Sequence, residues 1–267
     1  MLKRMYYGAM SAPLRGATVI VTRPAGTGAA LARRIRALGG EPLTLPGLAL
    51  RATDDATAAR RALAAARRAD VVVFISPAAV RYAWRLAPTL AFARRTRVCT
   101  VGAATAQALR RRGIADVLTP DSTQDADGLL AMAPLARLRG LTVALIGAPG
   151  GRDTLPNALR RRGATLVRAD VYYRTAPRWT RRHYAALETA PKPRLLLISS
   201  AEALAHLATR LPAGLVLALR DAETIVSSER LAGLAREHGF TRVHRARSAL
   251  AGDMLAAAAA ALGRHRL

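Results

Sequence analysis

Cysteine, aromatic and acidic residues are all scarce in this chain of 267 residues. Cys99 is its single cysteine, so no intrachain disulfide can form, and a free thiol suits the reducing cytoplasm. No run reaches the ~18 consecutive apolar residues that a membrane-spanning helix needs. The basic start lacks the apolar segment of a secretory signal, and we expect residues 1–15 to form a flexible tail. We therefore predict a cytoplasmic protein without a membrane partner.

Acidic residues number only 17 against 42 Lys and Arg, which gives a formal net charge of +25. Such a charge favours an anionic partner, either a nucleic acid or a metabolite that carries carboxylates or phosphates. The alternative is genomic, because nearly every basic residue is Arg and Ala is abundant, as GC-rich coding would give. A nucleic-acid module would need clustered arginines and stacking aromatics, and the sequence shows neither. We predict no nucleic-acid partner.

Motifs for metals and common cofactors are also missing. No His, Cys, Asp and Glu residues stand at metal-ligand spacing. The turn GAPGGRDT lacks the Lys-Ser/Thr of a phosphate-binding loop, and PAGTGAA is an incomplete dinucleotide pattern. There is no G-x-S-x-G elbow of a serine hydrolase. We expect neither a metal nor a cofactor.

What the sequence does contain is a regular alternation of apolar runs of strand length with amphipathic helical segments. Clear strand candidates are VIVT, VVVFIS, LTVALIG, RLLLIS and LVLAL (Leu215–Leu219). Alternation of this kind predicts parallel sheets covered by helices on both faces. For this length we predict an α/β fold with two doubly wound parallel-sheet domains.

Two pairs of segments repeat the same layout in the same order. VVVFISPAAVRYAW is similar to RLLLISSAEALAHL, and VGAATAQALRRRGIADV is similar to VSSERLAGLAREHGFTRV. Ser and Thr are favoured helix caps and recur at helix starts in any strand-helix unit, which is one explanation of the similarity. Two matched pairs favour the other explanation, which is a pair of similar domains.

Candidate binding residues lie where strands give way to helices, because ligands of parallel α/β sheets bind beyond the carboxyl ends of the strands. Helix N-termini at that edge attract anions. The residues so placed are Arg23, Ser76, Thr105, Ser199, Ser228 and the turn from Gly147 to Arg152. Each hydroxyl is either a helix cap or a ligand contact. Tyr172 lies where the composition changes before Pro177, which indicates a crossing between domains; it is either functional or, like Tyr173, a half-buried strand residue.

The same motifs resemble those of the uroporphyrinogen-III synthase family. The resemblance runs from about residue 16 to 263 in the order of the family. It rests on VIVTRP, VFISPAAV, VGAATAQAL, GGRDTLPNALRRRGATL, VYYRTAP and ISSAEAL.

This resemblance implies a bilobed protein with a two-stranded linker. A flexible tail (1–15) precedes a first flavodoxin-like domain (16–50 plus 177–267), and the second domain (51–176) has linkers at its ends. The implied reaction takes hydroxymethylbilane, a linear tetrapyrrole with carboxylate side chains, in the interdomain cleft. It removes water, inverts ring D and closes uroporphyrinogen III, a hydro-lyase step of heme biosynthesis. A monomer without cofactor is expected. The alternative is a non-catalytic, two-lobed polyanion-binding protein of the same fold.

The resemblance also implies residue roles. Tyr172 matches the tyrosine of V-Y-x-x and is the candidate that assists departure of the hydroxyl, and Thr105 matches the threonine of VG-x-x-T-A. Ser76 and Ser199 match serines whose backbone N–H groups hold substrate carboxylates, while Ser228 stands where a threonine is common. Arg23, Gly147 and Arg152 complete the candidate binding set.

Overall fold

The computed structural model of the chain describes residues 12–120, 126–150 and 154–264. The chain divides into two compact units, of which unit 1 comprises Met1–Ala49 and Thr175–Leu267 and unit 2 comprises Leu50–Arg174. Two short strands contain the boundaries, β3 (Ala49–Ala52) and β9 (Tyr172–Thr175), and they pair with each other in a two-stranded sheet.

Unit 1 is built on a five-stranded sheet of order β12-β11-β10-β1-β2, in which the neighbouring strands are parallel. Its described elements are β1 (Thr18–Val21), α1 (Ala29–Ala37), β2 (Glu41–Thr44), α7 (Arg181–Glu188), β10 (Arg194–Ile198), α8 (Ala201–Arg210), α9 (Ala213–Arg220), β11 (Glu223–Val226), α10 (Glu229–Glu237), β12 (Val243–Arg245) and α11 (Ala251–Arg264).

Unit 2 has a second parallel sheet, of order β6-β5-β4-β7-β8. Its described elements are α2 (Ala56–Ala66), β4 (Val71–Phe74), α3 (Pro77–Leu86), β5 (Arg97–Thr100), α4 (Ala103–Arg110), β6 (Val117–Leu118), α5 (Ala126–Ala131), the 3-10 helix η1 (Ala133–Leu135), β7 (Thr142–Gly147), α6 (Thr154–Arg161) and β8 (Thr165–Asp170).

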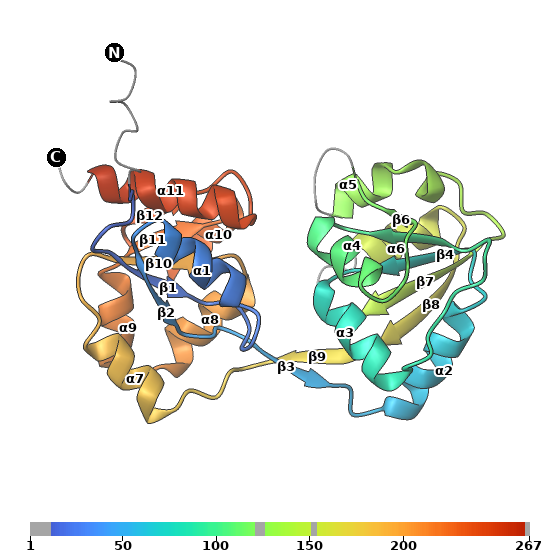
Figure 1. The fold of residues 1–267 in the computed structure, drawn as a ribbon, viewed down its shortest axis with the longest axis horizontal. Helices are drawn as coiled ribbons and strands as arrows, with labels where there is room; N and C mark the ends of the chain where they lie inside the picture. Colours follow the sequence, from blue (N-terminus) through green and yellow to red (C-terminus); the bar gives the residue numbers. More distant parts are fainter. Residues whose placement is uncertain (1–11, 121–125, 151–153, 265–267) are drawn as a thin grey trace, which may run out of the picture. The chain divides into compact units, whose positions relative to one another are not determined.

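Alternate residues of each strand enter two separate cores, which is why the strands read as continuous apolar runs. In unit 1, Ile20 packs with α8 to α10 on one face, whereas Val19 and Val21 pack with α1 and α11 on the other. In unit 2, Phe74 packs with α2, α3 and α4, and Val73 packs with α5 and α6. Helices therefore cover both faces of each sheet (Figure 1), and the predicted doubly wound α/β fold is confirmed.

The two sheets are related by circular permutation of the chain. Counted along the chain, the strands of unit 1 have the flavodoxin-like order 2-1-3-4-5. Unit 2 has the same spatial order when β7 and β8 take the places of β1 and β2, and β4, β5 and β6 those of β10, β11 and β12. The two repeated segment pairs in the sequence fall on these equivalent elements, β4–α3 with β10–α8 and β5–α4–β6 with β11–α10–β12.

Two local predictions are wrong. Leu215–Leu219 forms most of helix α9 and not a strand. Leu215 and Leu219 are buried while Leu217 is 61% exposed, a helical pattern that an all-apolar run hides because it has no polar residues to mark its period. A flexible tail was predicted for residues 1–15, but Leu14 is fully buried and its N–H donates to the Leu38 carbonyl at 2.9 Å. Residues 1–11 lie outside the described part.

Gly47 is required by packing beside α8. A Cβ atom there would lie 2.5 Å from the Cβ and 3.0 Å from the Cα of Ala203. We predict that Gly47→Ala lowers the free energy of unfolding by about 1–3 kcal/mol, the usual cost of overpacking. The matched control is Gly233→Ala in α10, where a Cβ meets nothing within 4 Å.

Gly233→Ala should raise the unfolding free energy by about 0.5–1 kcal/mol, because alanine loses less backbone entropy in a helix. Urea denaturation of both variants measures the difference. Equal effects of the two substitutions would contradict the packing requirement at Gly47.

Candidate functional site

In unit 2, Ser76 follows β4 and begins helix α3. Its extended backbone makes it the N-cap residue, and its Oγ accepts a hydrogen bond from the Ala79 N–H at 3.0 Å. Pro77 at the first helical position has the φ angle that a helix start requires. The strand end and the cap together fix the serine hydroxyl at the carboxyl edge of the sheet.

Tyr172 lies against that serine. It is the first residue of β9, its side chain is 4% exposed, and its hydroxyl oxygen lies 3.1 Å from Ser76 Oγ. Tyr173, the next residue, is half-buried. The structure thus gives the two tyrosines different surroundings and brings Tyr172 together with one of the predicted binding residues.

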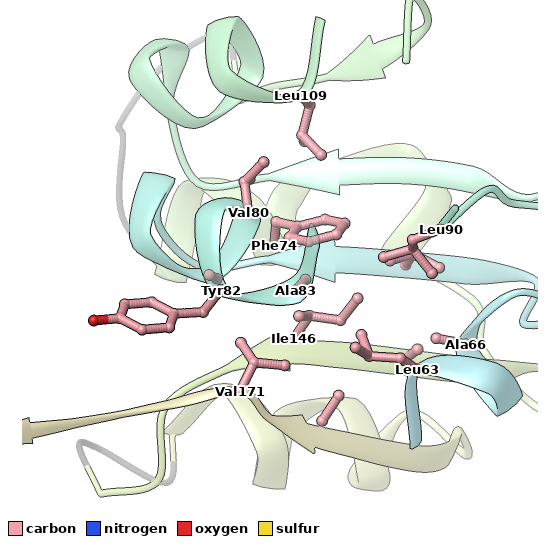
Figure 2. Close-up of a cluster of buried hydrophobic side chains, with 14 of the residues drawn as sticks. Leu63, Ala66, Phe74, Val80, Tyr82, Ala83, Leu90, Leu109, Ile146 and Val171 are labelled. Atoms are coloured by element: carbon pink, nitrogen blue, oxygen red, sulfur yellow. The ribbon is translucent and has the colours of Figure 1, made fainter. Parts of the chain in front are cut away.

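A third side chain, which the sequence analysis missed, completes this group. The ring of Tyr82 on α3 stacks on the Tyr172 ring, with centroids 5.4 Å apart and an interplanar angle of 17°. The Tyr82 hydroxyl donates to the Leu50 carbonyl at 2.9 Å. Figure 2 shows the Tyr82 ring pointing away from the core residues Phe74 and Ile146. Only the tertiary stacking reveals it, since its sequence position is that of an ordinary helix residue.

Thr105 and Gly147 follow or end strands of the same sheet of unit 2. Thr105 is a buried residue in the first turn of α4, which follows β5, the neighbour of β4. Gly147 ends β7, and a Cβ atom there would collide with the Ile75 side chain, so this glycine has a packing role. Its carbonyl accepts from the Val171 N–H at 2.9 Å, directly before Tyr172. Arg152, also predicted to bind substrate, lies outside the described residues.

In unit 1, Arg23 and Ser199 are brought together at the ends of the neighbouring strands β1 and β10, where they line one small recess. The Arg23 guanidinium donates to the Ala249 carbonyl at 3.4 Å, and burial lowers its pKa. Ser228 caps α10, with its Oγ accepting from the Leu231 N–H at 3.3 Å.

Ser200 was missed by the sequence analysis, which chose its neighbour Ser199. Ser200 is the N-cap of α8, and its Oγ accepts from the Ala203 N–H at 3.3 Å. It is therefore the residue of unit 1 that is equivalent to Ser76, while Ser199 is exposed. The sequence signal for Ser200 was its position directly before helix α8, where an N-cap residue is expected.

Within residues 12–120, 126–150 and 154–264, no three His, Cys, Asp or Glu side chains are grouped so that they could hold a metal ion. No helix in this part of the chain has the length and apolarity to span a membrane. The described groups therefore offer hydroxyls, helix N-termini and arginines, which are suited to binding anions.

Comparison with known proteins gives the family. The family profile described as uroporphyrinogen-III synthase HemD matches residues 29–256. The uroporphyrinogen-III synthase of Salmonella typhimurium strain LT2 is 29% identical over 242 residues, which cover 84% of this chain and 92% of that protein.

Two solved structures have the same fold. They are a mutant uroporphyrinogen III synthase from the extremely thermophilic bacterium Thermus thermophilus, with a TM-score of 0.56 and 21% identity, and uroporphyrinogen-III synthetase from Helicobacter pylori 26695, with a TM-score of 0.57 and 14% identity. The first match covers 93% of this chain and 99% of that chain, and the second covers 92% and 99%. The fold defines a protein of two doubly wound α/β units. The profile spans most of its length, and the chain belongs to the uroporphyrinogen-III synthase family.

Cys99 is not available as a nucleophile. It is fully buried in β5, and burial raises the pKa of its thiol to about 11, with Arg97 opposing the shift. The reactive thiolate would be about a thousandth of the population near pH 8. We predict that native protein resists iodoacetamide and that Cys99 is alkylated after unfolding in guanidinium chloride. Mass spectrometry measures this, and rapid labelling of the native protein would contradict it.

Proposed function

We propose that the chain is an active uroporphyrinogen-III synthase, which cyclises hydroxymethylbilane to uroporphyrinogen III with inversion of ring D and loss of water. Family membership supports this proposal over most of the chain. The observation that carries it at the level of the site is the 3.1 Å contact between the hydroxyls of Tyr172 and Ser76. That contact holds a buried phenol at the edge of the sheet where substrates of parallel α/β proteins bind.

In the reaction that we propose, Tyr172 assists the departure of the substrate hydroxyl. Its phenol donates a proton as the carbon–oxygen bond breaks and water leaves. The pyrrole N–H proton then returns to the phenolate, so that a neutral, electrophilic azafulvene remains. Without enzyme, this electrophile closes head to tail and gives isomer I. The protein must instead hold ring D so that its substituted carbon attacks first, through a spiro intermediate that rearranges to isomer III. Catalysis is then mainly positioning and selective binding of the transition state.

We propose that substrate carboxylates bind at the strand-end edges of both units. Ser76 and Ser228 cap α3 and α10, and Thr105 lies in the first turn of α4. Ser199 directly precedes Ser200, the cap of α8. Backbone N–H groups and the helix dipole favour anions at such positions. Arg23 adds a cation at the end of β1.

The free, buried thiol of Cys99 supports a cytoplasmic location. The monomeric state stays a prediction.

The deciding experiment supplies hydroxymethylbilane to the purified chain and separates the oxidised products by chromatography. We expect isomer III to form above the spontaneous background of isomer I, because the enzyme must redirect ring closure. Product made only of isomer I would favour the non-catalytic polyanion-binding alternative.

Tyr172→Phe removes the hydroxyl that contacts Ser76 and should lower kcat for isomer III by about 10²-fold, the usual contribution of a general acid. Tyr173→Phe is the matched control and should change kcat less than about twofold, because the hydroxyl that contacts Ser76 belongs to Tyr172 and not to the half-buried Tyr173. Steady-state kinetics measure both variants, and an equal or reversed ranking would exclude Tyr172 as the acid.

A further inference from the structure

Two exposed arginines lie beside the tyrosine pair of unit 2. Arg81 and Arg85 are four residues apart on α3 and therefore share one face of that helix. Their guanidinium carbons lie 5.1 and 5.4 Å from the centroid of the Tyr82 ring. Helical side chains lean toward the helix N-terminus, which for α3 is the strand-end edge that carries Ser76.

The ring beneath these arginines is buried and held by two contacts. Tyr82 is 5% exposed, stacks on Tyr172 and donates its hydroxyl to the Leu50 carbonyl. Figure 2 shows the ring extending from α3 to the margin of the core. A cation over an aromatic face gains about 0.5–1 kcal/mol at an exposed site. The fixed ring therefore restrains two long side chains whose charges stay open to solvent, which reduces the ordering cost when they bind a ligand.

Some other arginines of the described chain are held by conventional structural partners. The Arg162 guanidinium donates to the carbonyls of Leu130 and Leu135, and Arg242 pairs with Asp221 at 3.4 Å. Among the described residues, neither Arg81 nor Arg85 makes an ion pair or a side-chain hydrogen bond. A favourable interaction with the C-terminal end of the α3 dipole accounts for Arg85 alone. The helix dipole does not explain why both arginines contact the Tyr82 ring, next to Tyr172.

We propose that Arg81 and Arg85 form a subsite that binds carboxylate side chains of the linear tetrapyrrole beside Tyr172, with Tyr82 as the residue that orients them. The proposal rests on the proposed function for the identity of the substrate. Guanidinium groups bind carboxylates through paired, charge-assisted hydrogen bonds. Two of them at i and i+4 can take two carboxylates, and a substrate anchored there is held next to the hydroxyl of Tyr172.

The test combines kinetics with direct binding. The double variant Arg81→Gln/Arg85→Gln should raise KM for hydroxymethylbilane about tenfold, since charge-assisted contacts are lost, while kcat changes less than about threefold. It should also weaken binding of uroporphyrin, a stable octacarboxylate probe, about tenfold in an absorbance titration. The two single variants should fall between the double variant and the parent protein. Circular dichroism and thermal unfolding confirm that each variant is folded.

The matched control is Arg110→Gln/Arg111→Gln, which removes the same charge from exposed residues at the C-terminal end of α4 in the same unit. It should leave both KM and the uroporphyrin affinity unchanged. If the parent protein forms isomer III, and the Arg81/Arg85 double variant keeps the parent's KM and uroporphyrin affinity, the subsite is overturned while the proposed function stands. If the parent protein forms no isomer III, the proposed function is overturned. If, in addition, uroporphyrin affinity is lost in the Arg81/Arg85 double variant and kept in the control, the subsite is supported. Equal losses in both double variants would mean that net charge, and not this subsite, binds the probe.

Discussion

The meeting of β4 and β7 at one edge of the unit 2 sheet is the constraint on which the candidate site depends. These parallel strands are in register up to Phe74 of β4 and Ile146 of β7, so the segments that leave the two strands start side by side. Gly147 has no side chain and leaves room for Ile75, and its carbonyl receives the N–H of Val171. That hydrogen bond fixes where β9 starts and sets Tyr172 within 3.1 Å of Ser76. A backbone contact thus positions the side chain that we propose as the acid.

The permuted relation between the two sheets explains why similar polar residues recur at both strand-end edges. Ser76 and Ser200 cap equivalent helices, and Ser228 occupies the cap position that Gly102 takes in the other unit. Two of these helix N-terminal sites in each unit suit a substrate with many carboxylates better than a substrate with one anionic group. Tyr172 lies outside this repetition, because it belongs to β9, which pairs with β3 and is part of neither five-stranded sheet.

Much of the fold could be predicted from the sequence, because buried parallel strands read as continuous apolar runs closed by Ser, Gly or Pro. The same argument failed for Leu215–Leu219, where a buried helix is just as continuous and only the exposure of Leu217 reveals the period. The sequence placed the candidate residues at strand ends, and the structure brings two of them, Tyr172 and Ser76, together. Which of Ser199 and Ser200 caps α8 depends on which of the two has the extended backbone directly before the helix, and that residue is Ser200. The role of Tyr82 depends on a stacking contact with a residue far along the chain, which no local pattern encodes.

The net charge of +25 illustrates the same limit, because charge alone does not separate structural cations from binding cations. Arg162 and Arg194 are committed to main-chain carbonyls, where they stabilise the ends of helices and the turns beside them. Such residues would be abundant in an arginine-rich protein whatever it binds. Arg81 and Arg85 differ in that their contact is with an aromatic ring that itself touches Tyr172. Recognition of an acidic substrate is therefore better argued from how a guanidinium is held than from how many there are.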